Sequence, residues 1–310
     1  MPEFSYEPSR HIPFADRNEI ARCRAIKRSE IEQHANPDFH IQVVPDEDLV
    51  FIWLTDIYRR IKEAGEAGQP IVMLLPNPWP GYRHLARWIN ATRLDCKHCH
   101  WFAMDEYADQ DGRVAPETWD RGFYYALLRF LWSEIDEDLR PPRGQVHAPS
   151  NDNLDHYGQL MQDAGGLDIS YTGPGWTGHM AFVEPDAPEF AGSFDEWKQM
   201  GTRICTLSPF TLAQNSLHGS VGLSGDLSAI PPKSATIGPK EIIAAKNRFE
   251  MSGISIQGTV SSWQRLTARL CYHGPVTPKL PTSLLQTLRT DVYITETIAA
   301  DIHDTWDKGY

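Results

Sequence analysis

Short apolar runs that alternate with helix-like segments constrain the fold more than any other feature of the sequence. Residues 71–75, IVMLL, form an unbroken apolar run between Gly68 and Pro76, which predicts a strand buried on both faces of a sheet. Before this run, the apolar residues between Leu49 and Ile61 share one helical face. Strands that alternate with helices of this length predict a Rossmann-like α/β fold, with a doubly wound, mostly parallel sheet flanked by helices.

The same alternation continues along the chain and sets the expected domain organisation. We expect further strands near residues 100–104, 167–171, 254–257 and 291–295, and helices near 82–89, 117–135, 152–163, 240–248, 263–272 and at the C-terminal end. Residues 39–310 then form a single α/β domain. Residues 1–38 form a partly helical N-terminal extension, because Asp16 followed by Glu19 is typical of a capped helix, which would run to about Gln33.

Charge and apolar content exclude several classes of protein. The chain has 310 residues, a formal net charge of −12 and no cluster of Lys and Arg, so a nucleic-acid partner is not expected. Its first residues contain no apolar stretch of signal-peptide length, and its longest apolar runs are too short to cross a bilayer. We therefore expect a cytoplasmic protein with no membrane partner. A homo-oligomer is compatible with the sequence.

One cysteine-containing segment resembles metal and haem motifs. Residues 96–100, CKHCH, match the C-x-x-C-H pattern of c-type haem attachment and half of a zinc knuckle. The five cysteines are scattered, no second Cys pair completes a zinc site, and no export signal supports haem attachment. We therefore interpret the segment as the approach to a buried strand, and expect no metal ion, no cofactor and no disulfide framework.

Ionisable side chains that follow two of the predicted strands are the candidates for chemistry. Asp105 and Glu106 follow one strand, where a carboxylate can act as general base, although a loop or helix-cap role is the alternative. His179 and Glu184 follow another, and form an oriented acid–base pair if a turn brings them together; a structurally paired loop histidine is the alternative. Parallel strands would bring both places to one edge of the sheet.

Two longer motifs resemble those of a known enzyme family. Residues 102–107, FAMDEY, resemble the F-N-M-D-E-Y motif of glucosamine-6-phosphate deaminases, and residues 178–185, GHMAFVEP, resemble their G-H-I-A-F-N-E-P motif. Shorter matches at residues 116–119, 235–238 and 282–286 keep the family's order, so the resemblance extends from about residue 40 to 300. The related 6-phosphogluconolactonases carry D-E-R rather than D-E-Y and lack the E-P ending, so the deaminases are the closer branch.

The resemblance implies a fold of the deaminase type, a reaction and a role for each matched residue. The family converts an amino sugar phosphate to a ketose phosphate and ammonia. Carried over by position, His179 would open the sugar ring with assistance from Glu184, and Asp105 would move a proton between C2 and C1. The implied partner is a small-molecule sugar substrate.

Residues just outside the two motifs depart from the family. Thr177 stands where the family has the aspartate of D-G-H, and a hydroxyl cannot stabilise an imidazolium as a carboxylate does. The family's phosphate loop, L-P-T-G-G-T-P, is here LPNPWPG at residues 75–81, whose prolines lack amide donors. Leu217 replaces the phosphate-binding arginine of N-S-R, and the lysine of G-S-Q-K has no clear match. These changes together predict a substrate other than the usual sugar 6-phosphate.

The expected substrate site therefore combines family positions with aromatic and basic ones. Trp79 and Trp176 lie in the two loops, where an indole face can stack on the apolar face of a sugar ring. Arg83, His84 and Arg265 lie near the altered segments and are candidates to replace the lost phosphate contacts. The full set of expected substrate-binding residues is Glu106, Asn77, Trp79, Gly81, Trp176, Thr177, Gly178 and Arg265.

Three functions fit these residues. The first is an enzyme of carbohydrate metabolism that isomerises a sugar or amino sugar, with or without deamination, by proton transfer through Asp105, His179 and Glu184. The second is a non-catalytic sugar-binding or regulatory homologue, which Thr177 favours. The third is a lactonase in which His179 activates a water, which the D-E-Y pattern disfavours. Turnover, stabilisation by ligand and lactone hydrolysis distinguish them.

Overall fold

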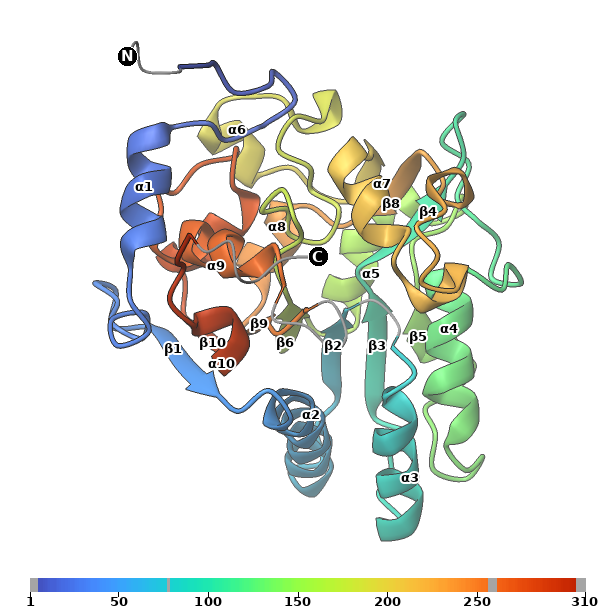
Figure 1. The fold of residues 1–310 in the computed structure, drawn as a ribbon. Coiled ribbons are helices and arrows are strands. Elements are labelled where there is room, and N and C mark those ends of the chain that lie inside the picture. The colour runs from blue at the N-terminus through green and yellow to red at the C-terminus, as the bar shows by residue number, and fades with distance from the viewer. Residues whose placement is uncertain (1–4, 77–78, 256–260, 305–310) are drawn as a thin grey trace.

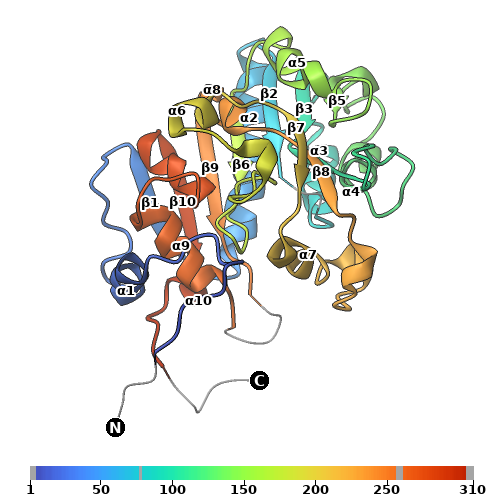
Figure 2. The ribbon, with the colours of Figure 1, turned by 90° about the horizontal axis from the view of Figure 1, so that it is seen from above.

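A seven-stranded sheet forms the centre of the molecule. The computed structural model describes residues 5–76, 79–255 and 261–304. The strands lie in the order β1-β10-β9-β6-β2-β3-β5, and all their described pairings are parallel. Their bounds are β1 Phe39–Val44, β2 Ile71–Leu75, β3 Cys99–Ala103, β5 Val146–His147, β6 Ile169–Thr172, β9 Asn247–Ser252 and β10 Thr290–Thr295. Helices lie on both faces of this sheet, which confirms the predicted fold class (Figures 1 and 2).

Each face of the sheet has its own apolar core, and β2 contributes to both. Ile71, Met73 and Leu75 pack on one face. Their partners are α2 Asp48–Glu66, α3 Tyr82–Thr92 and α4 Phe123–Phe130. Val72 and Leu74 pack on the opposite face with α5 Tyr157–Asp163, α8 Pro239–Ala244 and α9 Gln264–His273. Because side chains alternate along a strand, an unbroken apolar run can supply both layers, as its sequence predicts.

The remaining helices are short and connect the larger elements. They are α1 Arg17–Ala25, α6 Phe194–Lys198, α7 Pro209–Asn215 and α10 Glu296–Ala299, and seven short 3-10 turns: η1 Trp132–Glu134, η2 Arg143–Gln145, η3 Leu154–His156, η4 Pro188–Phe190, η5 Gly219–Val221, η6 Leu227–Ala229 and η7 Pro281–Thr287. Among the described residues, no helix combines the length and the apolar character that crossing a bilayer requires.

Several predicted elements have different bounds in the structure. The helix expected over 117–135 begins at Phe123, because Gly122 has an extended backbone there. The helix expected over 240–248 ends at Ala244, because the Arg248 guanidinium donates to the carbonyls at the end of α8 and the chain continues as β9. The strand expected at 254–257 is wrong for its described part, since Ile254 already lies beyond β9.

The segment after β3 is a strand rather than the expected loop. β4 Asp105–Ala108 pairs antiparallel with β8 Lys233–Thr236, which in turn pairs with β7 Arg203–Thr206. The switch between the sheets occurs at Met104. Its amide donates to the Leu75 carbonyl in the parallel sheet, whereas its carbonyl accepts from the Ile237 amide beside β8. A second, three-stranded sheet therefore holds Asp105 at the edge of the first.

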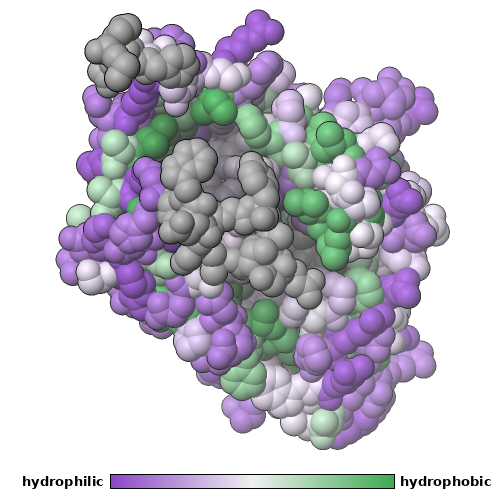
Figure 3. All heavy atoms as spheres, viewed as in Figure 1, coloured by the Kyte–Doolittle hydropathy of each residue, from purple (hydrophilic) through white to green (hydrophobic). Residues whose placement is uncertain are grey.

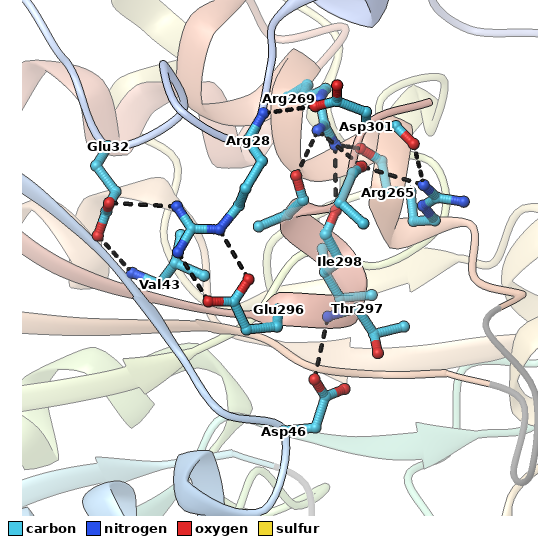
Figure 4. A network of polar contacts seen from close by, with 12 residues as sticks. Arg28, Glu32, Val43, Asp46, Arg265, Arg269, Glu296, Thr297, Ile298 and Asp301 are labelled. Atoms are coloured by element: carbon cyan, nitrogen blue, oxygen red, sulfur yellow. Dashed lines mark hydrogen bonds and ion pairs between the residues drawn. The ribbon is translucent and has the colours of Figure 1, made fainter. Parts of the chain in front are cut away.

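The N-terminal extension is held against the body of the protein. Asp16 caps α1 by accepting from the amides of Asn18 and Glu19 at 3.0 and 3.1 Å, as predicted, but the helix ends at Ala25, well before Gln33. Side chains of α1 pack on α9, and Cys23 is fully buried there. Figure 4 shows the polar contacts beyond α1, where the extension meets α10 and the C-terminal segment.

Candidate functional site

The two family motifs meet at the carboxyl edge of the parallel sheet. Asp105 follows β3 and the loop that leads to His179 follows β6, and both strands are neighbours of β2. Asp105 pairs across the second sheet with Thr236, whose hydroxyl accepts the Phe182 amide of the second motif at 3.0 Å. This edge is where open parallel sheets bind ligands, so the topology brings the predicted acid–base residues to a chemically useful place.

His179 lies in a buried network of hydroxyl groups and a carboxylate. Its side chain is 4% exposed, and its Nδ1 atom is 3.0 Å from Thr177 Oγ1, 3.1 Å from Thr211 Oγ1 and 3.6 Å from Glu184 Oε2. The Thr177 hydroxyl donates to Glu184 Oε2 at 3.0 Å, and can therefore accept from Nδ1–H. Thr177 thus bridges the imidazole and the carboxylate, the two groups predicted to act as a pair.

Glycine makes room for the imidazole and shapes its loop. A Cβ atom on Gly175 would lie 1.8 Å from His179 Nε2, so only glycine fits there. Gly178 has a φ of +78°, in the left-handed region that disfavours other residues. Thr282 then fixes the loop, because its amide donates to the Gly178 carbonyl at 3.0 Å and its hydroxyl donates to the His179 carbonyl at 3.1 Å.

The carboxyl groups of this edge are in contrasting electrostatic environments. Burial raises the pKa of Asp105 well above its usual range, and the nearby Glu106 raises it further. Asp105 is 2% exposed, and its Oδ1 has no hydrogen-bond partner among the described residues. Burial also acts to raise the pKa of Glu184, but the charge of His179 and hydrogen bonds from His179, Thr211 and the Ser208 amide outweigh it and leave this pKa below its usual value. Separated pKa values of this kind are typical of acid–base sites.

Glu106 has a structural position rather than an open one. Its carboxylate accepts the amides of Tyr107, Phe123 and Tyr124 at 2.8, 3.0 and 2.8 Å, and it is 1% exposed. Two of these amides belong to the first turn of α4, whose own N-cap residue, Gly122, has no side chain to offer. The helix-cap alternative therefore describes Glu106 better than the substrate contact that we expected.

The described residues that flank the loop after β2 offer few free donors to a phosphate group. The first amides of α3, on Tyr82, Arg83 and His84, already donate to the carbonyls of Trp79, Pro80 and Gly81. Free amides of this kind are what a helix N-terminus offers an anion. The Trp79 indole covers Gly81 so closely that a Cβ there would lie 1.6 Å from its ring.

Other positions in the altered phosphate segments also differ from the expectation. Asn77, an expected substrate contact, lies outside the described residues. Leu217, at the family's arginine position, is 44% exposed. Trp79 packs against Trp53 on α2, with ring centroids 5.9 Å apart. Its indole therefore contacts a core residue, whereas the stacking partner of Trp176 is Trp263.

Two of the three candidate replacement cations, Arg83 and Arg265, have partners elsewhere. Arg83 lies 3.2 Å from Glu134 and stacks over the Phe130 ring. His84 lines a small hollow beside α2 with Phe51 and Trp88. Arg265 lines a large cavity near the His179 loop, but its Nη2 donates to the backbone carbonyls of residues 300 and 301. In the described residues, none of these three groups forms a phosphate pocket at the β2 loop.

Trp176, Thr177 and Gly178 line that cavity together with Arg265. Its volume is about 920 Å³, and its other walls are mostly apolar. Trp176 is 42% exposed and stacks on Trp263, with ring centroids 5.4 Å apart and an interplanar angle of 21°. Four of the expected substrate residues therefore do come together, whereas Trp79, Gly81 and Glu106 line other parts of the molecule.

Two features of the site had no clear signal in the sequence. Thr211 contacts His179 from α7, 32 residues further along the chain. Trp263 precedes α9 and meets Trp176 only in the folded protein. Cys96 lies buried just before β3 and Cys99 is the first residue of that strand, both as free thiols. In the described ranges, no group of three or more His, Cys, Asp or Glu side chains is placed to hold a metal ion.

Comparison with known proteins agrees with the two motifs. No protein-family model matches the chain. It is 26% identical over 211 residues to the glucosamine-6-phosphate deaminase of Lachnoclostridium phytofermentans, covering 66% of this chain and 77% of that relative. It is 28% identical over 227 residues to the glucosamine-6-phosphate deaminase of Rhodopirellula baltica, covering 72% of this chain and 79% of the relative.

Solved structures share the fold at lower identity. A monomeric glucosamine-6-phosphate deaminase superposes with a TM-score of 0.67 at 20% identity, covering 84% of this chain and 98% of that one. The 6-phosphogluconolactonase of Thermotoga maritima superposes with a TM-score of 0.53 at 17% identity, covering 83% and 99%. The parallel sheet and the loop at its carboxyl edge thus define an α/β protein with the fold of these sugar enzymes. Within that class, the chain is a divergent homologue of the glucosamine-6-phosphate deaminases.

Proposed function

We propose that the protein isomerises an unphosphorylated amino sugar and releases its amino group as ammonia. The observation that carries the proposal is the buried network of His179, Thr177, Thr211 and Glu184 at the same sheet edge as Asp105. A histidine held by a carboxylate and a second carboxyl group with a raised pKa together suit two successive proton transfers.

His179 opens the sugar ring in this proposal. Its Nδ1–H faces the two threonine hydroxyls and Glu184, so Nε2 is the atom that exchanges a proton with the ring oxygen of the sugar. Glu184 stabilises the imidazolium that forms, both directly and through the Thr177 hydroxyl. The hydroxyl bridge replaces the aspartate of the family motif and explains how Glu184 can serve without it.

Asp105 then moves the proton that converts the open-chain aldose. As a carboxylate it takes the proton from C2 and returns it to C1, which leaves a ketose form with an imine at C2. Water adds to that carbon and ammonia leaves, so one amino sugar and one water give one ketose and one ammonia. Burial makes the Asp105 carboxylate a stronger base than an exposed one, because its conjugate acid has a raised pKa.

Three observations favour a substrate without the 6-phosphate. The first-turn amides of α3 are already bonded, Trp79 covers Gly81, and Leu217 offers no charge where the family has an arginine. Loss of a buried charged contact costs about 2–5 kcal/mol of binding free energy, so losing several would remove useful affinity for a phosphate.

Turnover on matched sugars tests both the chemistry and the substrate. We expect ammonia release from glucosamine at a higher kcat/KM than from glucosamine 6-phosphate. Asp105→Asn and His179→Ala should each reduce it by about 10²–10⁴-fold, whereas Asp111→Asn, at an exposed turn after β4, should leave it unchanged. The proposal fails if both active-site variants keep wild-type rates.

The same panel separates the other two candidate functions. Hydrolysis of sugar lactones without ammonia release from any amino sugar would favour a lactonase, the activity named for the Thermotoga maritima neighbour. Thermal stabilisation by a sugar that is never consumed would favour a non-catalytic binding protein.

A further inference from the structure

We propose that the cavity beside Thr177 is a subsite for a second sugar ring, so that the preferred substrate is an amino-sugar disaccharide with a free reducing end. This inference rests on the proposed isomerisation at His179. It also assigns a role to the N-terminal extension, which supplies one wall of the cavity.

Several distant parts of the chain build the cavity. The His179 loop and α7 contribute Trp176 and Phe210, the start of α9 contributes Trp263 and Leu266, and the extension contributes Phe14 and Ile20. In Figure 3, green apolar surface borders the central part of the face from which Figure 1 is drawn, while the periphery is mostly purple. A cavity of this composition takes a ligand with an apolar face and few charges.

The aromatic side chains offer a flat surface to a ring. Trp176 stacks on Trp263 and lies 6.3 Å from Phe210, centroid to centroid, with the two rings tilted by 55°. Nevertheless, 42% of Trp176 remains exposed to solvent. An indole that two aromatic neighbours hold in place, and that keeps part of its surface exposed, suits the apolar C–H face of a pyranose ring.

The cationic groups that line the cavity are only partly engaged. Arg24 pairs with Asp304, and Arg265 Nη2 donates to the carbonyls of Ala300 and Asp301, but Arg265 Nε has no hydrogen-bond partner among the described residues. A ring hydroxyl could accept from this Nε–H, and the mostly apolar lining favours a neutral, hydroxyl-rich ring.

Size and reaction chemistry decide how the second ring is attached. Cavities of about 300–1,000 Å³ enclose most of a drug-sized ligand, and one hexose is smaller than that; this cavity has about 920 Å³. Isomerisation requires a free C1 on the reacting sugar, so the second ring must be linked through another position. Thr177 and Gly178, the two residues that directly precede His179 in the chain, line the cavity, so the proposal places the second ring beside this loop.

The wall supplied by the extension is firmly anchored. The guanidinium of the fully buried Arg269 donates to the carbonyl of Ile26 in the extension. It also donates to the carbonyls of Ala299 and Ala300, and to that of Ile298, which Figure 4 labels beside it. Arg28 makes a two-pronged ion pair with Glu296 at 2.8 Å on each side. The extension is therefore fixed to both α9 and α10, and the subsite exists before a ligand arrives.

Calorimetric binding and turnover, measured with two probes, test the subsite. The probes are glucosamine and the β-1,4-linked disaccharide of glucosamine, whose reducing end is free. We expect the disaccharide to bind about tenfold more tightly, because one stacked ring contributes at least the free energy of an aromatic pair. Phe14→Ala and Trp263→Ala should each remove most of this advantage, and Phe14→Ala should leave glucosamine binding unchanged. Phe51→Ala, an exposed aromatic on α2, is the matched control.

The outcomes separate this inference from the proposed function. Ammonia release from glucosamine with no tighter binding of the disaccharide would overturn the subsite and leave the reaction intact. Tighter disaccharide binding that Trp263→Ala abolishes, without turnover of any sugar, would support the subsite and overturn the reaction. Binding of inorganic phosphate that Arg24→Gln abolishes would overturn the subsite in favour of an anion site. Thermal unfolding shows which variants fold. If only one of Phe14→Ala and Trp263→Ala folds, that variant alone is enough to test the subsite.

Discussion

Replacing Thr177 with valine would test the central feature of the site, the hydroxyl that bridges His179 and Glu184. Valine has nearly the same shape, so it removes the hydroxyl without leaving a large cavity. The hydroxyl takes part in two buried contacts of 3.0 Å, one to Glu184 Oε2 and one to His179 Nδ1. Thr211 and the Ser208 amide remain as partners of the pair.

The magnitude follows from these contacts. A buried hydrogen bond to a charged group contributes about 1.5–3 kcal/mol, and the remaining partners place the loss near the middle, at about 2 kcal/mol. If the imidazolium–carboxylate pair forms in the rate-limiting step, kcat should fall by about 30-fold. Removing a donor to a carboxylate raises its pKa, so the acidic limb of the pH–rate profile should move to higher pH.

The stability of Thr177→Val should depend on pH in the same sense. The folded-state pKa of Glu184 is lowered, so its charged form stabilises the fold above the unfolded-state pKa, and this contribution is lost as the pH falls through the folded-state pKa. The variant should therefore be destabilised more at pH 7 than at pH 4.

Kinetics and urea unfolding at several pH values measure both effects. Thr177→Ser keeps the hydroxyl and should stay close to wild type. Thr295→Val, at a buried threonine whose hydroxyl has no partner among the described residues, should not reduce activity. Wild-type kcat and an unshifted acidic limb in Thr177→Val would refute the role of the bridge.

Three further changes have defined outcomes. Gly175→Ala should displace the buried His179 ring, because its Cβ would lie 1.8 Å from Nε2. We expect at least about 100-fold loss of kcat and a lower unfolding midpoint, because added volume in a packed site is destabilising. Gly144→Ala, with nothing near its Cβ position, should be neutral in the same assays. Glu250→Gln should stabilise the protein increasingly as the pH rises from about 5 to 8. Burial raises the pKa of Glu250 to about 8, so the unfolded state releases the proton at lower pH than the folded state, which lowers the free energy of unfolding of the wild type by up to about 4–5 kcal/mol. A difference in unfolding free energy between variant and wild type that is the same at pH 5 and pH 8 would contradict this. Arg269→Lys should loosen the extension, because one ammonium group cannot reach all the carbonyls that the guanidinium contacts. We expect faster proteolysis within residues 5–38 and a loss of about 2–4 kcal/mol in the free energy of unfolding. An unchanged rate of cleavage would argue against the role of Arg269 in holding the extension.

The elements that were predictable from the sequence are those whose signal is local. The run at β2 and the apolar face of α2 were clear because each lies within one short window, and the structure has both. The end of α8 was not predictable, because the groups that stop it are the carbonyls taken by Arg248 after the chain has turned back. β4 was missed for a related reason, since its partner strand β8 lies more than a hundred residues away.

The candidate site also contains features that the sequence predicted and features that it did not. The two motifs named Asp105, His179 and Glu184 as residues that share one sheet edge, and the parallel topology of β3 and β6 follows from the alternating pattern. Their catalytic roles remain predictions. Glu106 shows the limit of a motif, because its two oxygens are taken by amides of a helix whose start was not apparent from the sequence.

By itself, the sequence determined the fold class, the relatives and the absence of the family's charged residues around a phosphate, because periodicity and residue identity are local properties of the chain. Only the tertiary structure decided what replaced them. The hydroxyl of Thr211 beside His179 and the aromatic cavity lined in part by the extension join segments far apart in the sequence, and the bridge from Thr177 to Glu184 forms because the chain turns between Met180 and Val183. Such contacts depend on side-chain packing in three dimensions, which no single window of residues contains.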